Sequence, residues 1–136
     1  MTGRRVGVGD LVAIPAGPTR EIVGHVLFCS AYFDQVVLLA LYPVDAHCDA
    51  ATIREARKQR RLVFTGRQVI VAGHWRRIGV LLPSDESAVV RFIAGGEVWE
   101  NDTPVRAATD ADMDPLPKLL VKGAGLVEKV AQSLIE

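Results

Sequence analysis

The 136-residue sequence lacks the long apolar runs that mark secreted and membrane proteins. Its N-terminal residues hold no run long enough for a signal peptide, and the longest apolar run, residues 36–42, is far too short to cross a bilayer. The two cysteines, Cys29 and Cys48, could pair in principle, but a chain without a signal peptide suggests a reducing compartment. We therefore predict two free thiols and a cytoplasmic protein with no membrane partner.

Histidine, the commonest side-chain ligand of metals, is also scarce. The histidines are His25, His47 and His74. A zinc site could recruit a set of residues whose spacing repeats no known ligand motif: Asp45, His47, Cys48 and His74. The run Asp110, Asp112, Asp114 resembles the start of a calcium loop, but Pro115 and Val121 stand where that loop needs glycine and glutamate. We predict neither a metal nor a cofactor.

Motifs for catalysis are equally scarce. Cys29 could act as a nucleophile beside a histidine, but it lies in an apolar strand-like run, where inert packing is the usual outcome. No serine lies in a glycine-flanked elbow, and no pair of carboxylates stands out on a rigid element. The sequence therefore predicts a protein that is not an enzyme, and a small enzyme using one of the three histidines is the least favoured alternative.

Charge is balanced overall but unevenly distributed. The net charge is zero, yet residues 54–77 hold eight basic residues and one acid, and residues 85–114 hold eight acids and two arginines. Such a dipolar chain can steer a charged partner, although folding can also bring the two segments together and cancel their fields.

Short runs of valine, isoleucine and leucine between glycines and prolines dominate the rest of the chain. They predict a single α+β, mainly β domain over residues 1–136, built as a twisted antiparallel sheet or a partly open SH3-like barrel. The expected strands are residues 11–14, 21–33, 36–42, 62–64, 68–72, 78–82, 88–94, 97–99 and 103–107. Gly24 should mark a bulge or a close backbone approach, Gly95 and Gly96 a hairpin turn, and Trp75 the anchor of the packing.

Two helices are expected, with a helical turn at residues 116–121. A short surface helix should begin at Asp49 or Thr52, with Glu55 completing a capping box, and end near Gln59. It would present four basic residues on one outward face: Arg54, Arg57, Lys58 and Arg61. A C-terminal helix over residues 125–135 should pack on the sheet through one side, formed by Leu126, Val127, Val130 and Leu134.

Two segments of the first 83 residues carry a family pattern. Residues 9–15, GDLVAIP, followed by GHVL at residues 24–27, resemble the opening of the immunity protein 26 family of bacterial polymorphic toxin systems. Residues 75–79, WRRIG, with the later Pro83, are similar to the second block of that family. The resemblance implies a small cytoplasmic protein that binds a cognate toxin domain and occludes its active site without catalysis.

The acidic segment is the first candidate for the toxin interface, since a toxin that acts on nucleic acid carries a basic cleft. The candidate residues are Asp85, Glu86, Glu97, Trp99, Glu100, Asp102, Asp110 and Asp112. Trp99 would point outward if Val98 points into the core, although core packing is the commoner place for a tryptophan. The basic helix face is the alternative interface.

A nucleic-acid- or small-ligand-binding β-barrel module is the remaining alternative. A Gly-Asp turn leading into a strand, as at Gly9 and Asp10, recurs in SH3-like barrels, and the basic residues could contact phosphates. The basic segment has no interleaved aromatic residues for base stacking, however, and the pI is near 6.8. We therefore expect no nucleic-acid partner, and the sequence predicts no oligomeric state.

Overall fold

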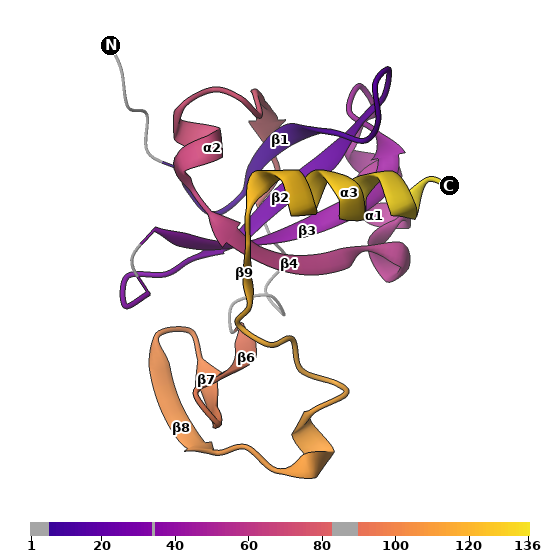
Figure 1. Cartoon of the computed structure of the whole chain (residues 1–136). Coiled ribbons are helices and arrows are strands. Elements are labelled where there is room, and N and C mark those ends of the chain that lie inside the picture. The colour runs from indigo at the N-terminus through magenta and orange to yellow at the C-terminus, as the bar shows by residue number, and fades with distance from the viewer. Residues whose placement is uncertain (1–5, 34, 83–89) are drawn as a thin grey trace.

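The computed structural model describes residues 6–33, 35–82 and 90–136, which form two β-sheets and three α-helices (Figure 1). The strands are β1 Asp10–Pro15, β2 Glu21–Cys29, β3 Val36–Asp45, β4 Arg61–Gly66, β5 Arg77–Val80, β6 Arg91–Ala94, β7 Glu97–Glu100, β8 Thr103–Ala107 and β9 Val121–Lys122. The helices are α1 Ala50–Glu55, α2 Gln68–Val71 and α3 Ala124–Leu134, and the short 3₁₀ helices are η1 Arg57–Gln59 and η3 Asp110–Asp112.

The six strands of the first sheet run in the order β5-β1-β2-β3-β4-β9, and the second sheet has the order β6-β7-β8. All neighbouring strands are antiparallel except β4 and β9, which pair in parallel. The predicted α+β, mainly β class is therefore confirmed. The first sheet is mixed, not wholly antiparallel, and among the described strands it stays open, with β5 and β9 at its edges.

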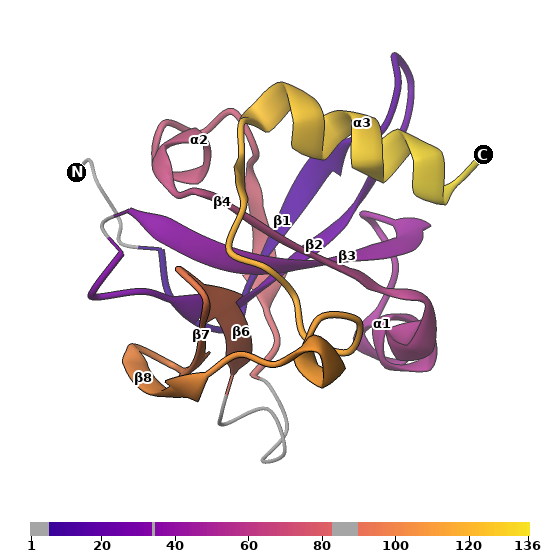
Figure 2. The ribbon, with the colours of Figure 1, turned by 60° about the horizontal axis from the view of Figure 1, so that its bottom comes forward.

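Both faces of the first sheet are covered, as Figure 2 shows with α3 and the second sheet on opposite sides. On one face, Val127 and Ala131 of α3 pack in a core with Ile14 of β1 and Trp75. Trp75 is 1% exposed, and its Nε1 donates to Glu128 of α3 over 2.9 Å, so its predicted anchoring role is confirmed.

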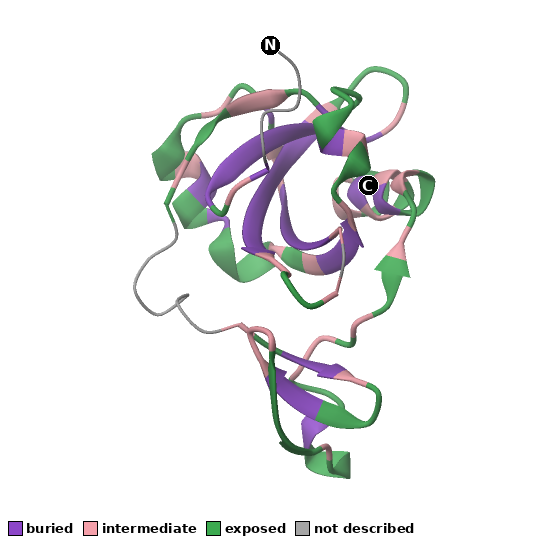
Figure 3. Cartoon of the chain, turned by 90° about the vertical axis from the view of Figure 1, so that its left-hand side faces the viewer, coloured by how far each residue is buried: buried purple, intermediate pink, exposed green. Residues whose placement is uncertain are grey.

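The opposite face of the first sheet meets α1 and the second sheet. Ile53 of α1 and Phe92 of β6 belong to one buried cluster with Phe28 and Phe64, and the ring of Phe92 lies 5.3 Å from that of Phe64. This double coverage explains why β2 and β3 are nearly continuous apolar runs, since strands buried on both faces have no polar side (Figure 3).

The turn and close-approach predictions for glycine are confirmed. A Cβ placed on Gly24 would lie 2.3 Å from Cδ1 of Ile14, so only glycine fits beside that side chain. Gly95 and Gly96 have φ angles of 59° and 79° and join β6 to β7. Pro43 was expected to end its strand, but β3 continues to Asp45. The pairing of β3 with β2 is irregular at this point and skips Pro43, which has no N–H to donate.

Two of the expected elements are wrong. The segment predicted as a strand at residues 68–72 is helix α2, which buries Ile70 against the core. A run of four apolar or neutral residues is too short to display a period, so it fits either structure. Residues 116–121 form no helical turn: Lys118 bridges to Ile93, and Val121 pairs with Phe64.

The two expected helices are present with changed details. Helix α1 ends at Glu55, and η1 follows it after Ala56. Its N-cap is Asp49, whose side chain accepts from the Thr52 N–H over 2.9 Å, instead of a capping box from Thr52. In α3 the buried stripe includes Val127, whereas Leu126 is 55% exposed and was wrongly placed on it.

Candidate functional surfaces

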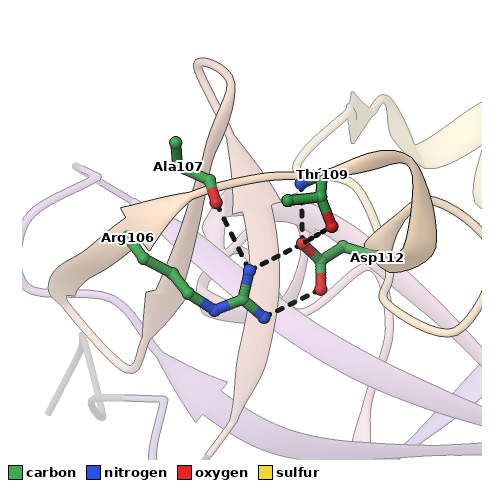
Figure 4. Close-up of polar contacts among 4 residues, drawn as sticks. All are labelled: Arg106, Ala107, Thr109 and Asp112. Atoms are coloured by element: carbon green, nitrogen blue, oxygen red, sulfur yellow. Dashed lines mark hydrogen bonds and ion pairs between the residues drawn. The ribbon is translucent and has the colours of Figure 1, made fainter.

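Asp112, one of the predicted toxin contacts, already forms hydrogen bonds with other residues of the chain (Figure 4). Its carboxylate accepts two hydrogen bonds from the Arg106 guanidinium, at 2.7 and 2.8 Å, and a third from the Thr109 N–H at 2.7 Å. The Arg106 contact, more than any other, holds the pKa of Asp112 well below its usual value. Asp112 is buried and caps η3, so it stabilises this loop and presents no free charge to a partner.

Two further acids of the predicted interface also bind groups of the chain. Asp102 accepts from the Ser30 hydroxyl at 2.5 Å and from the Ala31 N–H at 2.8 Å, which ties the β2–β3 loop to the second sheet. Glu100 accepts from Arg91 Nε at 2.8 Å across the β6–β7 pair. Three of the five described acids of the predicted interface, Glu100, Asp102 and Asp112, therefore bind groups of the chain.

The remaining acids of that set differ in position. Glu97 and Asp110 are exposed, on β7 and η3. Asp85 and Glu86 lie outside the described residues. Among the described acids of the predicted interface, Glu97 and Asp110 are thus the most exposed residues, and they belong to different elements.

Trp99 is buried, which contradicts the idea of an exposed interface residue. It is 7% exposed, its Nε1 donates to the Ala94 carbonyl over 3.1 Å, and its ring lies 4.9 Å from that of Phe33. The neighbouring Val98 is buried as well. Strand alternation placed these two residues on opposite faces, but both faces of β7 are covered, so neither side chain reaches solvent.

The basic face, defined as Arg54, Arg57, Lys58 and Arg61, is exposed at all four positions. The single helix expected to carry these residues is divided among α1, η1 and the start of β4. The buried side chains of Ile53 and Ala56 fix this segment on the first sheet, and Asp49 caps its first turn. The structure therefore presents the four cations on an anchored segment.

The three histidines occupy different environments. His25 of β2 is buried, and its Nε2 lies 2.5 Å from the Leu81 carbonyl oxygen, which can only accept, so Nε2 carries a proton. Burial lowers the pKa of His25, and its Nδ1 has no hydrogen-bond partner among the described residues. His47 and His74 are exposed.

The two thiols are free, as predicted. Burial raises the pKa of Cys29 and of Cys48, which favours the protonated form over the reactive thiolate. Across residues 6–33, 35–82 and 90–136, no group of three or more histidine, cysteine or carboxylate side chains is placed to hold a metal ion.

Comparison of the chain with family models, with curated protein sequences and with solved structures gave no match. The resemblance to the immunity protein 26 family therefore stays a prediction. In the described parts of the chain, none of the helices has the length and apolar character needed to span a membrane.

Proposed function

We propose that the chain is an immunity-type binding protein, which neutralises a cognate bacterial toxin by covering the toxin's active site. One observation carries the proposal: all four cations of the basic face are exposed, whereas Trp99 and Asp112 of the acidic set are buried. The toxin as partner class comes from the resemblance at residues 9–15 and 75–79. The proposed contact is therefore the basic face, and the acidic face is the weaker candidate.

The basic face would act mainly on the rate and orientation of binding. An exposed ion pair contributes only about 0–1 kcal/mol, so four cations alone do not make a tight complex. They do attract an acidic surface on the toxin over about one Debye length, roughly 8–10 Å at physiological salt. The first sheet holds α1 and η1 in place through Ile53 and Ala56, so the bound basic face would stay over the toxin's active site and keep substrate out.

The test is protection from a toxin encoded beside the gene of this chain. The proposal expects a neighbouring gene to encode a large secreted protein. The C-terminal domain of that protein is expressed alone and together with this chain, and survival of the host cells is counted. The proposal expects survival with the wild-type chain and loss of survival when all four cations of the basic face are changed to glutamate. Lethality that persists although both proteins are soluble would refute the proposal.

Matched variants separate the two faces. Arg20→Glu with Lys129→Glu changes two exposed cations elsewhere on the chain and should leave protection intact. Glu97→Lys with Asp110→Lys should also leave it intact, and a loss there would return the interface to the acidic segment. Mixed-sequence DNA and RNA in a gel shift provide the remaining check: binding that the basic-face variant loses, without any protection from toxin, would identify a nucleic-acid-binding protein instead.

A further inference from the structure

Just before α3 the chain passes from the second sheet to the first sheet. Lys118 bridges to Ile93 of the second sheet, and the Leu119 N–H donates to the Ile93 carbonyl over 2.8 Å. Two residues later the chain joins the first sheet, where Val121 and Lys122 pair with Phe64 and Thr65 of β4. The strand β9 is therefore only two residues long, and the chain that precedes it turns away from β4.

Among the described residues, this arrangement leaves the start of β4 paired on one side only. Residues 61–63 pair with β3 on one side, and among the described residues no strand pairs with them on the other. In an edge strand, alternate residues direct their N–H and C=O groups away from the sheet, where they can bind another strand. The unpaired stretch of β4 is therefore a template for an added strand.

A groove lies beside this edge, between β4 and the segment that leaves it. Its volume is about 240 Å³, and its apolar lining includes Leu62, Phe64, Met113, Leu116 and Leu120. The volume is below the roughly 300–1,000 Å³ of sites for whole small molecules, so it suits one or two side chains better than a cofactor. Leu120 is 64% exposed and forms part of the rim.

The charged residues that line the groove, among the described residues, are both cations, Lys118 and Lys122. Asp112 and Asp114 flank the lining residue Met113 in the sequence, and the carboxylate of Asp112 is bound by Arg106. Arg61, at the first position of β4, is exposed, but strand alternation places it on the face of the sheet opposite to Leu62 and Phe64. An acidic segment would thus find two cations, Lys118 and Lys122, in the lining of the groove.

We propose that the edge of β4 binds an extended acidic segment of a protein partner, which adds as a strand alongside residues 61–63. An apolar side chain of the segment fills the groove, and its flanking carboxylates contact Lys118 and Lys122. Main-chain hydrogen bonds supply affinity in this mode, and the alternate side chains supply specificity. The proposal does not require the partner to be a toxin, so it can fail or hold independently of the immunity function.

The probe is the capped peptide Glu-Val-Leu-Val-Glu, titrated into the ¹⁵N-labelled full-length chain. We expect amide shifts concentrated at Leu62, Val63 and Leu120. The matching Lys-Val-Leu-Val-Lys peptide should bind at least about tenfold more weakly because its charges oppose those of the groove, and N-methylation of alternate peptide amides should abolish binding. No binding of the acidic peptide up to about 1 mM would overturn the proposal.

Variants locate the site. Leu120→Glu places an acid on the rim of the groove and should weaken the acidic peptide at least about tenfold. Leu126→Glu makes the same change at an exposed leucine of α3 and should leave the affinity unchanged, and circular dichroism checks that both variants fold. Equal effects of the two variants would refute the location. Concentration-dependent shifts at Leu62 without peptide, lost in Leu120→Glu, would identify a second copy of the chain as the occupant and overturn the peptide proposal.

Discussion

Replacing Gly24 with alanine tests the packing between β1 and β2. The added Cβ would lie 2.3 Å from Ile14 Cδ1 and 3.0 Å from Val12 Cγ2, whereas carbon atoms normally pack at about 3.5–4.0 Å. Ile14 is fully buried, so its side chain has no solvent into which it can move. Overpacking of this kind costs about 1–3 kcal/mol, and alanine recovers about 0.5–1 kcal/mol by restricting the unfolded chain. We expect Gly24→Ala to lower the free energy of unfolding by about 1–2 kcal/mol.

A double-mutant cycle shows whether that loss comes from the contact with Ile14. Ile14→Val removes Cδ1, the atom nearest to the added Cβ, and on its own should cost about 0.5–1.5 kcal/mol. The pair of substitutions should be less destabilising than the sum of the two single changes, by about 1 kcal/mol. The control is Gly66→Ala, where the nearest atom to the added Cβ is 4.0 Å away, so only the restriction of the unfolded chain remains and the protein should be as stable as wild type or more stable by up to about 1 kcal/mol.

The measurement is urea unfolding followed by tryptophan fluorescence, since Trp75 and Trp99 are both buried. The slope of free energy against urea should stay the same in every variant, which shows that the midpoints report stability alone. A Gly24→Ala protein as stable as the wild type, or strictly additive effects with Ile14→Val, would refute the argument that β1 and β2 approach too closely here for any side chain at position 24.

Two predictions concern pH. The pKa of His25 is lowered by burial, so below about pH 6.5 the unfolded chain binds a proton that the folded chain does not, and the free energy of unfolding should fall as the pH drops. Urea unfolding from pH 7.5 to 5 measures this dependence. His25→Gln should reduce the dependence of stability on pH, and His74→Gln should not. The pKa of Asp112 is lowered chiefly by Arg106, so its contribution is complete above the usual aspartate pKa of about 3.9 and is lost at lower pH. Asp112→Asn should therefore lower the Tm at pH 7 and narrow its difference from wild type at pH 3; an undiminished difference at pH 3 would contradict the ion pair.

Most of the first sheet could be predicted from the sequence because its strands are apolar runs bounded by turn residues. The 11–14 run became β1, and the 62–64 run became the centre of β4. Helix α2 could not be predicted, since four residues give no measurable period and the tertiary contact of Ile70 decides the outcome. Residues 116–121 were misassigned for a related reason: their partners, Ile93 and Phe64, are far away in sequence.

The exposed Trp99 and the free Asp112 of the predicted acidic interface were wrong, because composition does not show which side chains are buried or already bound. One signal was available: Thr109 and Asp112 have the spacing of a capping box, which predicts that the carboxylate turns back to the chain. No local signal could reveal the contact of Asp102 with Ser30, since 71 residues lie between them. Exposure of the basic face was easier to predict, because long cationic side chains on a segment with few apolar positions stay in water.

The position of the second sheet explains why Asp102 and Asp112 are hydrogen-bonded to other residues of the chain. Strands β5 and β9 are at opposite edges of the first sheet, and the second sheet lies between them in the sequence. The chain must therefore cross a whole face of the first sheet to reach β9, and Phe92 and Trp99 fill that crossing with apolar contacts. A crossing of this length also needs polar contacts to hold its loops, and Asp102 and Asp112 provide them. Asp102 and Asp112 are thus part of the fold, while the basic face is exposed and residues 61–63 of β4 pair, among the described strands, with β3 alone.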